Sequence, residues 1–158
     1  MTTKKTLTFF KPDFENSRKL PYFEGGIKAG FPSPAADFEG TQISLDKVLV
    51  KNFEATFYAK ADGTSMIGAG IDDGDIMVID RSLEPTDGKI AVCCIDGEFT
   101  VKRIKVEKDA LYLMPENAAF QPIKVTEENK LLVWGIVTYV IYRDWETDRK
   151  STRLNSSH

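Results

Sequence analysis

The sequence predicts a single, mostly β domain of twisted antiparallel strands, with one short helix and an extended N-terminal arm. At 158 residues and 42% hydrophobic content, the chain can form one core of ordinary size. Beyond residue 55, short apolar segments alternate with Gly, Pro, Asp and Asn, a pattern typical of strands joined by turns. Residues 1–40 hold Gly, Pro and isolated aromatics without a sustained period, which indicates an arm that packs against something else. The aromatic residues that we expect to cover apolar area on the body of the same or a sister chain are Phe9, Phe10, Phe14, Tyr22 and Phe23.

The regular elements are predicted from local patterns in chain order. Behind Ser44, a residue type that caps helices, four apolar residues recur at helical spacing and predict a short helix over residues 44–53. These four are Leu45, Val48, Leu49 and Phe53. Six strands are predicted after the helix, over residues 56–61, 75–80, 89–95, 98–105, 110–114 and 131–142.

The dipeptide Asp96-Gly97 predicts the register of one strand pair. It lies between two alternating runs, which is a strong signal for a two-residue hairpin turn. Residue numbers of cross-strand partners should then sum to 193, so Lys102 is expected opposite Ala91. A small neighbour would leave room for the lysine amine.

Charge and composition exclude several classes of function. The formal net charge of -3 does not favour nucleic-acid binding by the chain alone and suits a protein partner better. No apolar run is long enough to cross a membrane, so a cytoplasmic protein is expected. Cys93 and Cys94 are adjacent and are interpreted as strand residues rather than metal or disulfide cysteines. The carboxylates of Asp72, Asp73 and Asp75 lack calcium-loop spacing, and no metal or cofactor is expected.

The last segment limits the chemistry that the folded part can perform. Its letters "DRKSTRLNSSH" resemble translated adapter or vector sequence, so residues 144–158 are interpreted as a non-native tail. The single histidine, His158, lies at the end of this tail. Without another histidine, the body cannot form a Ser-His-Asp or Cys-His site or a His-rich zinc site.

A serine activated by a lysine remains as a catalytic possibility. In "GTSMIG", Ser65 has a G-x-S-x-x-G spacing, one residue too long for the nucleophile elbow of α/β-hydrolases. Lys102 lies inside the apolar strand sequence "FTVKRI", where burial could lower an amine pKa from about 10.4 to roughly 7 or 8. Most strand lysines are solvated, so position alone identifies neither residue as catalytic.

Three separated motifs resemble those of a known family. In order, "GFPSPAAD", "DGTSMIGAGIDDGDIMVID" and "DGEFTVKRI" closely resemble the LexA-like self-cleaving Ser/Lys peptidases of the S24 class, in particular the UmuD branch, over residues 25–142. The resemblance implies a LexA/UmuD-like fold, with Ser65 as nucleophile, Lys102 as general base and Ala29-Gly30 as the scissile bond. Main-chain N–H groups at Ser65 and Met66 would then stabilise the oxyanion.

The resemblance also implies a biological setting. Residues 1–29 would be an arm removed by self-cleavage, and residues 30–143 the peptidase-like body. In this family an activated RecA-DNA filament stimulates cleavage, and the processed homodimer joins a UmuC-type polymerase for translesion synthesis in the SOS response. A LexA-type repressor would carry an N-terminal helix-turn-helix domain, whereas fewer than 30 residues precede the Ala29-Gly30 bond here. This shortage favours the UmuD branch.

Alternatives stay open at this point. Prolines 32 and 34 would hold the cleavage segment extended for binding as an added strand, yet such a stretch is also typical of a flexible linker. A non-enzymatic dimeric adaptor of the same fold would need neither a buried lysine nor an Ala-Gly bond. A truncated LexA-type repressor domain and a membrane signal peptidase would share the Ser-Lys pair, although the latter requires a membrane anchor.

Overall fold

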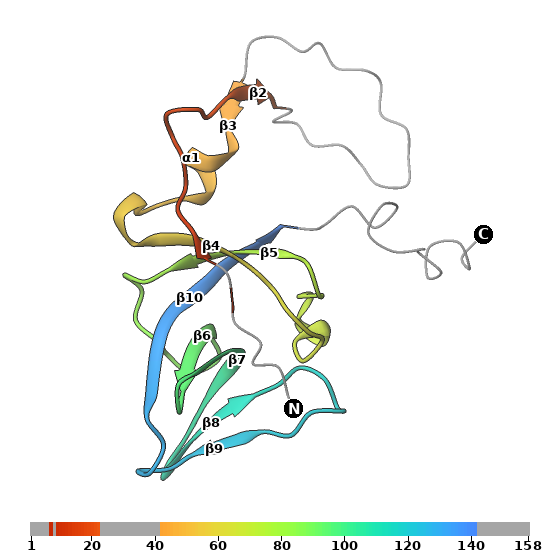
Figure 1. The fold of residues 1–158 in the computed structure, drawn as a ribbon, viewed down its shortest axis with the longest axis vertical. Helices are drawn as coiled ribbons and strands as arrows, with labels where there is room; N and C mark the ends of the chain where they lie inside the picture. The colour runs from red at the N-terminus through yellow and green to blue at the C-terminus, as the bar shows by residue number, and fades with distance from the viewer. Residues whose placement is uncertain (1–6, 8, 23–41, 142–158) are drawn as a thin grey trace, which may run out of the picture.

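Strands make up most of the regular structure. The computed structural model describes residue 7, residues 9–22 and residues 42–141 (Figure 1). Its strands are β1 Phe9–Phe10, β2 Lys19–Pro21, β3 Gln42–Ser44, β4 Thr56–Lys60, β5 Ile76–Asp80, β6 Ile90–Ile95, β7 Glu98–Glu107, β8 Ala110–Met114, β9 Ile123–Val125 and β10 Leu131–Ile141. Its helical elements are α1 Leu45–Leu49 and the 3-10 turns η1 Phe53–Ala55 and η2 Ile67–Ala69. The predicted mostly β, antiparallel fold is confirmed.

One eight-stranded antiparallel sheet, in the order β1-β4-β5-β10-β6-β7-β8-β9, forms the body. The long strand β10 pairs with β6 through its first half and with β5 through its second half, as Figure 1 shows. The pairing with β6 is irregular between Val133 and Gly135. A Cβ atom at Gly135 would lie 2.6 Å from the side chain of Ile79, so glycine permits this close contact. β10 therefore joins two parts of one bent sheet.

Two groups of buried side chains form the core. One lies around β4, β5 and the segment after β4, and it consists of Ala59, Ala61, Met66, Ile71, Met77, Ile79 and Val92. The other lies between β6, β7, β8 and β10, and it consists of Ala91, Cys93, Ile104, Leu113 and Ile136. β6 contributes to both groups because successive residues of a strand point to opposite faces of the sheet.

The six strands expected after residue 55 are all present, with small differences at their ends. The predicted hairpin is also confirmed: Asp96 and Gly97 have φ angles of 49° and 85°, and Lys102 pairs with Ala91. β1, β2, β3 and β9 were not predicted. Each has only two or three residues, which is too short to show an alternating pattern.

The predicted short helix is present, but its predicted length was wrong. α1 ends at Leu49 because Val50 adopts an extended conformation. Ser44 occupies the N-cap position, but its side chain makes no capping hydrogen bond. Leu45 and Val48 are exposed, so the spacing did not mark a core face. Phe53 belongs to the separate turn η1.

The N-terminal arm packs against the body through part of its aromatic set. The Phe9 ring lies 4.3 Å from Trp134 and 5.3 Å from Phe99, between ring centroids, and Phe14 lies 5.0 Å from Phe53. The expected packing is confirmed for these two residues on the same chain. Phe10 and Tyr22 are exposed. Phe23 lies outside the described residues.

A lysine ammonium also binds the arm to the body. Lys11 Nζ lies 2.8, 3.2 and 3.0 Å from the main-chain oxygens of Phe53, Glu54 and Thr56. It also lies 4.3 Å from the centroid of the Phe57 ring. All three donors of the ammonium are paired, and an aromatic face adds a cation-π contact. Lys11 is therefore a side-chain anchor of an arm that also pairs through β1 and β2 and packs through aromatic rings.

We expect Lys11→Met to loosen the arm without unfolding the body. The substitution keeps an apolar stem but removes the charged donor, and losing about 1 kcal/mol of attachment would raise local opening about fivefold. Amide hydrogen exchange of residues 9–17, followed by NMR, measures this change. Lys19→Met, at an exposed arm lysine in β2, is the matched control. Equal exchange in the two variants would contradict the role of Lys11.

Candidate active site

The amine of Lys102 lies beside the hydroxyl of Ser65. Lys102 is on β7 and is only 7% exposed. Its Nζ atom lies 3.1 Å from Ser65 Oγ, 2.6 Å from Thr100 Oγ1 and 3.1 Å from the carbonyl oxygen of Val101. Ser65 and Lys102 are 37 residues apart in sequence, so the fold brings them together. Proton transfer between the two side chains is possible at this distance.

The three polar contacts of the amine fit its neutral form. A neutral amine has two N–H donors and one lone pair. The Val101 carbonyl can only accept, and Thr100 Oγ1 can accept the second N–H. The lone pair is then available to the Ser65 hydroxyl. This arrangement allows Lys102 to remove the Ser65 proton while its own hydrogens remain bonded.

Burial favours the neutral amine. It lowers the pKa of Lys102 below its usual value, and Cys93 opposes this with a smaller effect. Cys93 pairs with Thr100 across the β6–β7 ladder, and burial raises the pKa of its thiol to about 11. The thiol is therefore protonated near neutral pH and places no full negative charge beside the lysine. Ala91, directly opposite Lys102, adds only a methyl group.

The loop that carries Ser65 is fixed from both sides. Met66 is buried in the core and anchors the loop. The main chain of Glu116 donates to the Ser65 carbonyl and accepts from the Gly68 N–H, both at 2.8 Å. The side-chain amide of Asn117 donates to the Thr64 carbonyl at 2.9 Å. These contacts join the loop to the chain that leaves β8.

Gly68 permits this close approach. A Cβ atom there would lie 2.6 Å from the Glu116 carbonyl oxygen, which is closer than side chains tolerate. The second glycine of "GTSMIG" is thus a packing requirement. Ser65 lies in a turn before η2, in the connection between two antiparallel strands, β4 and β5. This is not the fold of an α/β-hydrolase, so the rejection of that class is confirmed.

Comparison with known proteins identifies the family. A family model described as Peptidase S24-like matches residues 21–138. The chain belongs to this S24 peptidase family. Its relatives include the protein ImpA of Escherichia coli, 36% identical over 141 residues that cover 85% of this chain and 92% of ImpA. They also include the Escherichia coli protein MucA, 39% identical over 76% of this chain and 82% of MucA. The protein SamA of Salmonella typhimurium is 40% identical over 81% of this chain and 89% of SamA.

These comparisons confirm the family expected from the three motifs. The chain is a UmuD-like S24 protein, and S24 is a family of serine peptidases. The individual roles of Ser65 and Lys102 stay predictions. Ala29 and Gly30, the expected cleavage site, and the expected tail at residues 144–158 lie outside the described residues.

Sequence reasoning missed Thr100, the third polar side chain of this candidate site. The distance from Thr100 Oγ1 to Lys102 Nζ is 2.6 Å, the shortest of the three polar contacts of this amine. The available signal was its spacing, because residues i and i+2 of a strand lie on one face. A threonine two positions before a buried lysine can therefore reach the amine.

The acidic residues Asp72, Asp73 and Asp75 lie in a turn, where their carboxylates accept hydrogen bonds from main-chain N–H groups. Asp73 accepts from the Gly63 N–H at 2.7 Å, and Asp75 accepts from the Asp72 N–H at 2.9 Å. Within residues 7–22 and 42–141, leaving out residue 8, no group of His, Cys, Asp and Glu side chains is arranged to hold a metal ion. The helices in the same part of the chain lack the length and apolar character that crossing a membrane requires.

Proposed function

We propose that this S24 protein cleaves its own backbone between Ala29 and Gly30 with a Ser65-Lys102 dyad. The single observation that carries the proposal is that Lys102 Nζ lies 3.1 Å from Ser65 Oγ while the lysine is only 7% exposed. A buried, neutral lysine is one of the few bases that can activate a serine without histidine. Membership of a serine peptidase family supports the same chemistry.

The proposed reaction has an acylation step and a hydrolysis step. Neutral Lys102 takes the Ser65 proton as Oγ attacks the Ala29 carbonyl carbon. The tetrahedral intermediate collapses, the bond to the Gly30 nitrogen breaks, and the lysine proton passes to that nitrogen. Water, deprotonated by Lys102, then attacks the ester and releases the Ala29 carboxylate and the Ser65 hydroxyl. Because each chain is cut once, the reaction acts as a switch.

The main-chain N–H groups of Ser65 and Met66 are the proposed oxyanion donors. Among the described residues, neither group donates a backbone hydrogen bond, whereas Ile67, Gly68 and Ala69 all do. Two N–H groups beside the nucleophile that lack a backbone acceptor within the described part of the chain support this role, because an oxyanion site needs donors aimed at the developing charge.

The proposed products and partners follow the UmuD-like relatives. Cleavage removes residues 1–29 and leaves a body, residues 30–143, that begins at Gly30. The body acts as a cytoplasmic homodimer and joins a UmuC-type polymerase for translesion synthesis in the SOS response. An activated RecA filament on single-stranded DNA stimulates cleavage. The reaction uses no cofactor, and the chain does not itself recognise a DNA sequence. Similarity to the proteins ImpA, MucA and SamA supports this setting.

Self-cleavage should accelerate as pH rises. Only neutral Lys102 can accept the serine proton, so below the lowered pKa of the lysine the rate should rise about tenfold per pH unit, then level off. The Cys93 thiol, with its pKa of about 11, stays protonated below pH 10 and should not shape the profile. Intact mass spectrometry between pH 7 and 10 measures the cleaved fraction. An unchanged mass at every pH, with an activated RecA filament present, would overturn self-cleavage.

Removing either member of the dyad should abolish cleavage. Ser65→Ala removes the nucleophile and Lys102→Met removes the base while retaining an apolar stem, so each should slow the reaction by about a thousandfold or more. Circular dichroism checks that both variants fold. Lys105→Met, at an exposed lysine on the same strand, is the control and should cut at the parental rate. A Lys102→Met protein that cuts equally fast would refute the assigned base, and a fully active Ser65→Ala protein would refute the nucleophile.

Removing the arm should alter partner binding. Phe9 and Phe14 cover aromatic side chains of the body, and cleavage would leave those side chains accessible to a partner. A chain that starts at Gly30 should remain a dimer and bind a UmuC-type polymerase more tightly than the full-length Ser65→Ala protein. Light scattering and a polymerase titration measure the two properties. Equal affinities would show that the arm is not the switch, and a monomeric body would refute the proposed dimer.

A further inference from the structure

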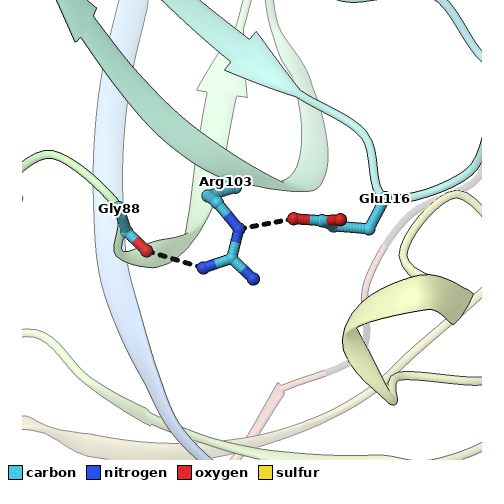
Figure 2. Close-up of polar contacts among 3 residues, drawn as sticks. All are labelled: Gly88, Arg103 and Glu116. Atoms are coloured by element: carbon cyan, nitrogen blue, oxygen red, sulfur yellow. Dashed lines mark hydrogen bonds and ion pairs between the residues drawn. The ribbon is translucent and has the colours of Figure 1, made fainter.

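An ion pair links the strand of Lys102 to the segment that holds Ser65. Arg103 follows Lys102 on β7, and its Nε atom donates to Glu116 Oε1 at 2.5 Å. Its Nη1 atom donates to the Gly88 carbonyl at 2.7 Å. Figure 2 shows the guanidinium between these two acceptors. Arg103 is thus tied both to the turn before β6 and to the segment after β8.

Glu116 continues this link to the nucleophile. Its carboxylate binds Arg103, while its main chain accepts from the Gly68 N–H and donates to the Ser65 carbonyl. A route of hydrogen bonds therefore runs from β7 to the Ser65 loop without passing through the dyad contact. Consecutive strand residues point to opposite faces, so Arg103 can hold this route while Lys102 faces Ser65.

We infer that Arg103 and Glu116 are positioning residues that set the separation of Ser65 and Lys102. The pair touches neither reacting atom and acts through the Glu116 main chain. Its side chains are 36% and 33% exposed, and ion pairs of this exposure add little to global stability. Its effect on geometry is different, because displacing a reacting group by 1 Å can slow a reaction by about a hundredfold.

The inference rests on the proposed self-cleavage and is tested in the full chain. Arg103→Ala and Glu116→Ala should each lower the plateau rate of cleavage about tenfold, since each releases the segment that holds Ser65. The double variant should be no slower than the slower single variant, because the residues act as one unit. Glu116→Gln keeps an acceptor for Arg103 and should restore most of the rate. Single variants that cut at the parental rate would overturn the inference.

The pH profile separates positioning from general damage to the site. If the pair only positions Ser65, Lys102 stays buried and the midpoint of the pH profile is unchanged while the plateau falls. If the variants instead open the site to water, the lysine pKa rises toward its usual value and the midpoint moves to higher pH. A shifted midpoint would therefore contradict a positioning role.

A second ion pair on β7 is the matched control. Lys105 and Glu107 lie 3.1 Å apart and are about half exposed. Glu107→Ala removes a strand carboxylate from an ion pair without touching the Ser65 loop, and it should leave the rate and the pH profile unchanged. A loss equal to that of Glu116→Ala would show that any charge lost near this sheet slows cleavage, which would overturn the inference.

Amide exchange tests the same link without any cleavage. The Gly68 N–H donates to the Glu116 carbonyl, so its hydrogen exchange should be about fivefold faster in Glu116→Ala and unchanged in Glu107→Ala. If the parental chain fails to cut itself while Gly68 exchange responds as expected, the proposed function fails and the link stands. If the parent cuts and Gly68 exchange is unaltered in Glu116→Ala, the positioning role fails alone.

Discussion

The burial of one amine beside one hydroxyl constrains the structure around the site. Water would stabilise a charged Lys102, and a charged lysine cannot accept the Ser65 proton. The site therefore needs a dry environment that still provides acceptors for the two hydrogens of a neutral amine. Thr100 and the Val101 carbonyl provide them, and Ala91 leaves the volume that the amine occupies. A carboxylate in place of the Cys93 thiol would hold the lysine charged.

The bent sheet brings the two halves of the site together. Ser65 lies on a loop anchored by Met66 in the core group around β4 and β5, whereas Lys102 lies on β7 beside the other group. β10 pairs with strands of both parts, and its irregularity at Gly135 allows the strand to change partners. The dyad distance therefore depends on contacts across this bend. Glu116 supplies such a contact directly, through two main-chain hydrogen bonds to the Ser65 loop.

The features that the sequence predicted correctly are those that a few neighbouring residues determine. Asp96-Gly97 fixed the hairpin register and so the pairing of Lys102 with Ala91, because a two-residue turn with two positive φ angles admits one alignment. The resemblance to S24 motifs indicated Ser65 and Lys102 as partners, which no periodicity could have done. Glu116 and its contact with Gly68 were missed because they depend on segments 48 residues apart, whose approach only the folded sheet determines. The helix over residues 44–53 was overextended because apolar spacing there did not correspond to burial.

The arm's attachment suits a segment that can be lost without collapse of the body. Phe9 packs on Trp134, and the Phe57 ring also packs on this indole, with 5.0 Å between ring centroids. The Arg81 guanidinium lies 4.4 Å from the indole centroid and donates to the main-chain carbonyl of Trp134. Trp134 would therefore keep body partners after the arm leaves. Two of the carbonyls that bind Lys11, those of Phe53 and Glu54, are exposed, so water can replace the ammonium there at small cost. Under the proposed cleavage, the body loses the ring contacts of Phe9 and Phe14, the cation site of Lys11 and the pairing of edge strand β1 with β4. None of these contacts is made to Ser65, Lys102 or Glu116. Phe9 packs against the core group that contains Met66, so loss of the arm would reach the Ser65 loop through that group rather than by direct contact with the dyad.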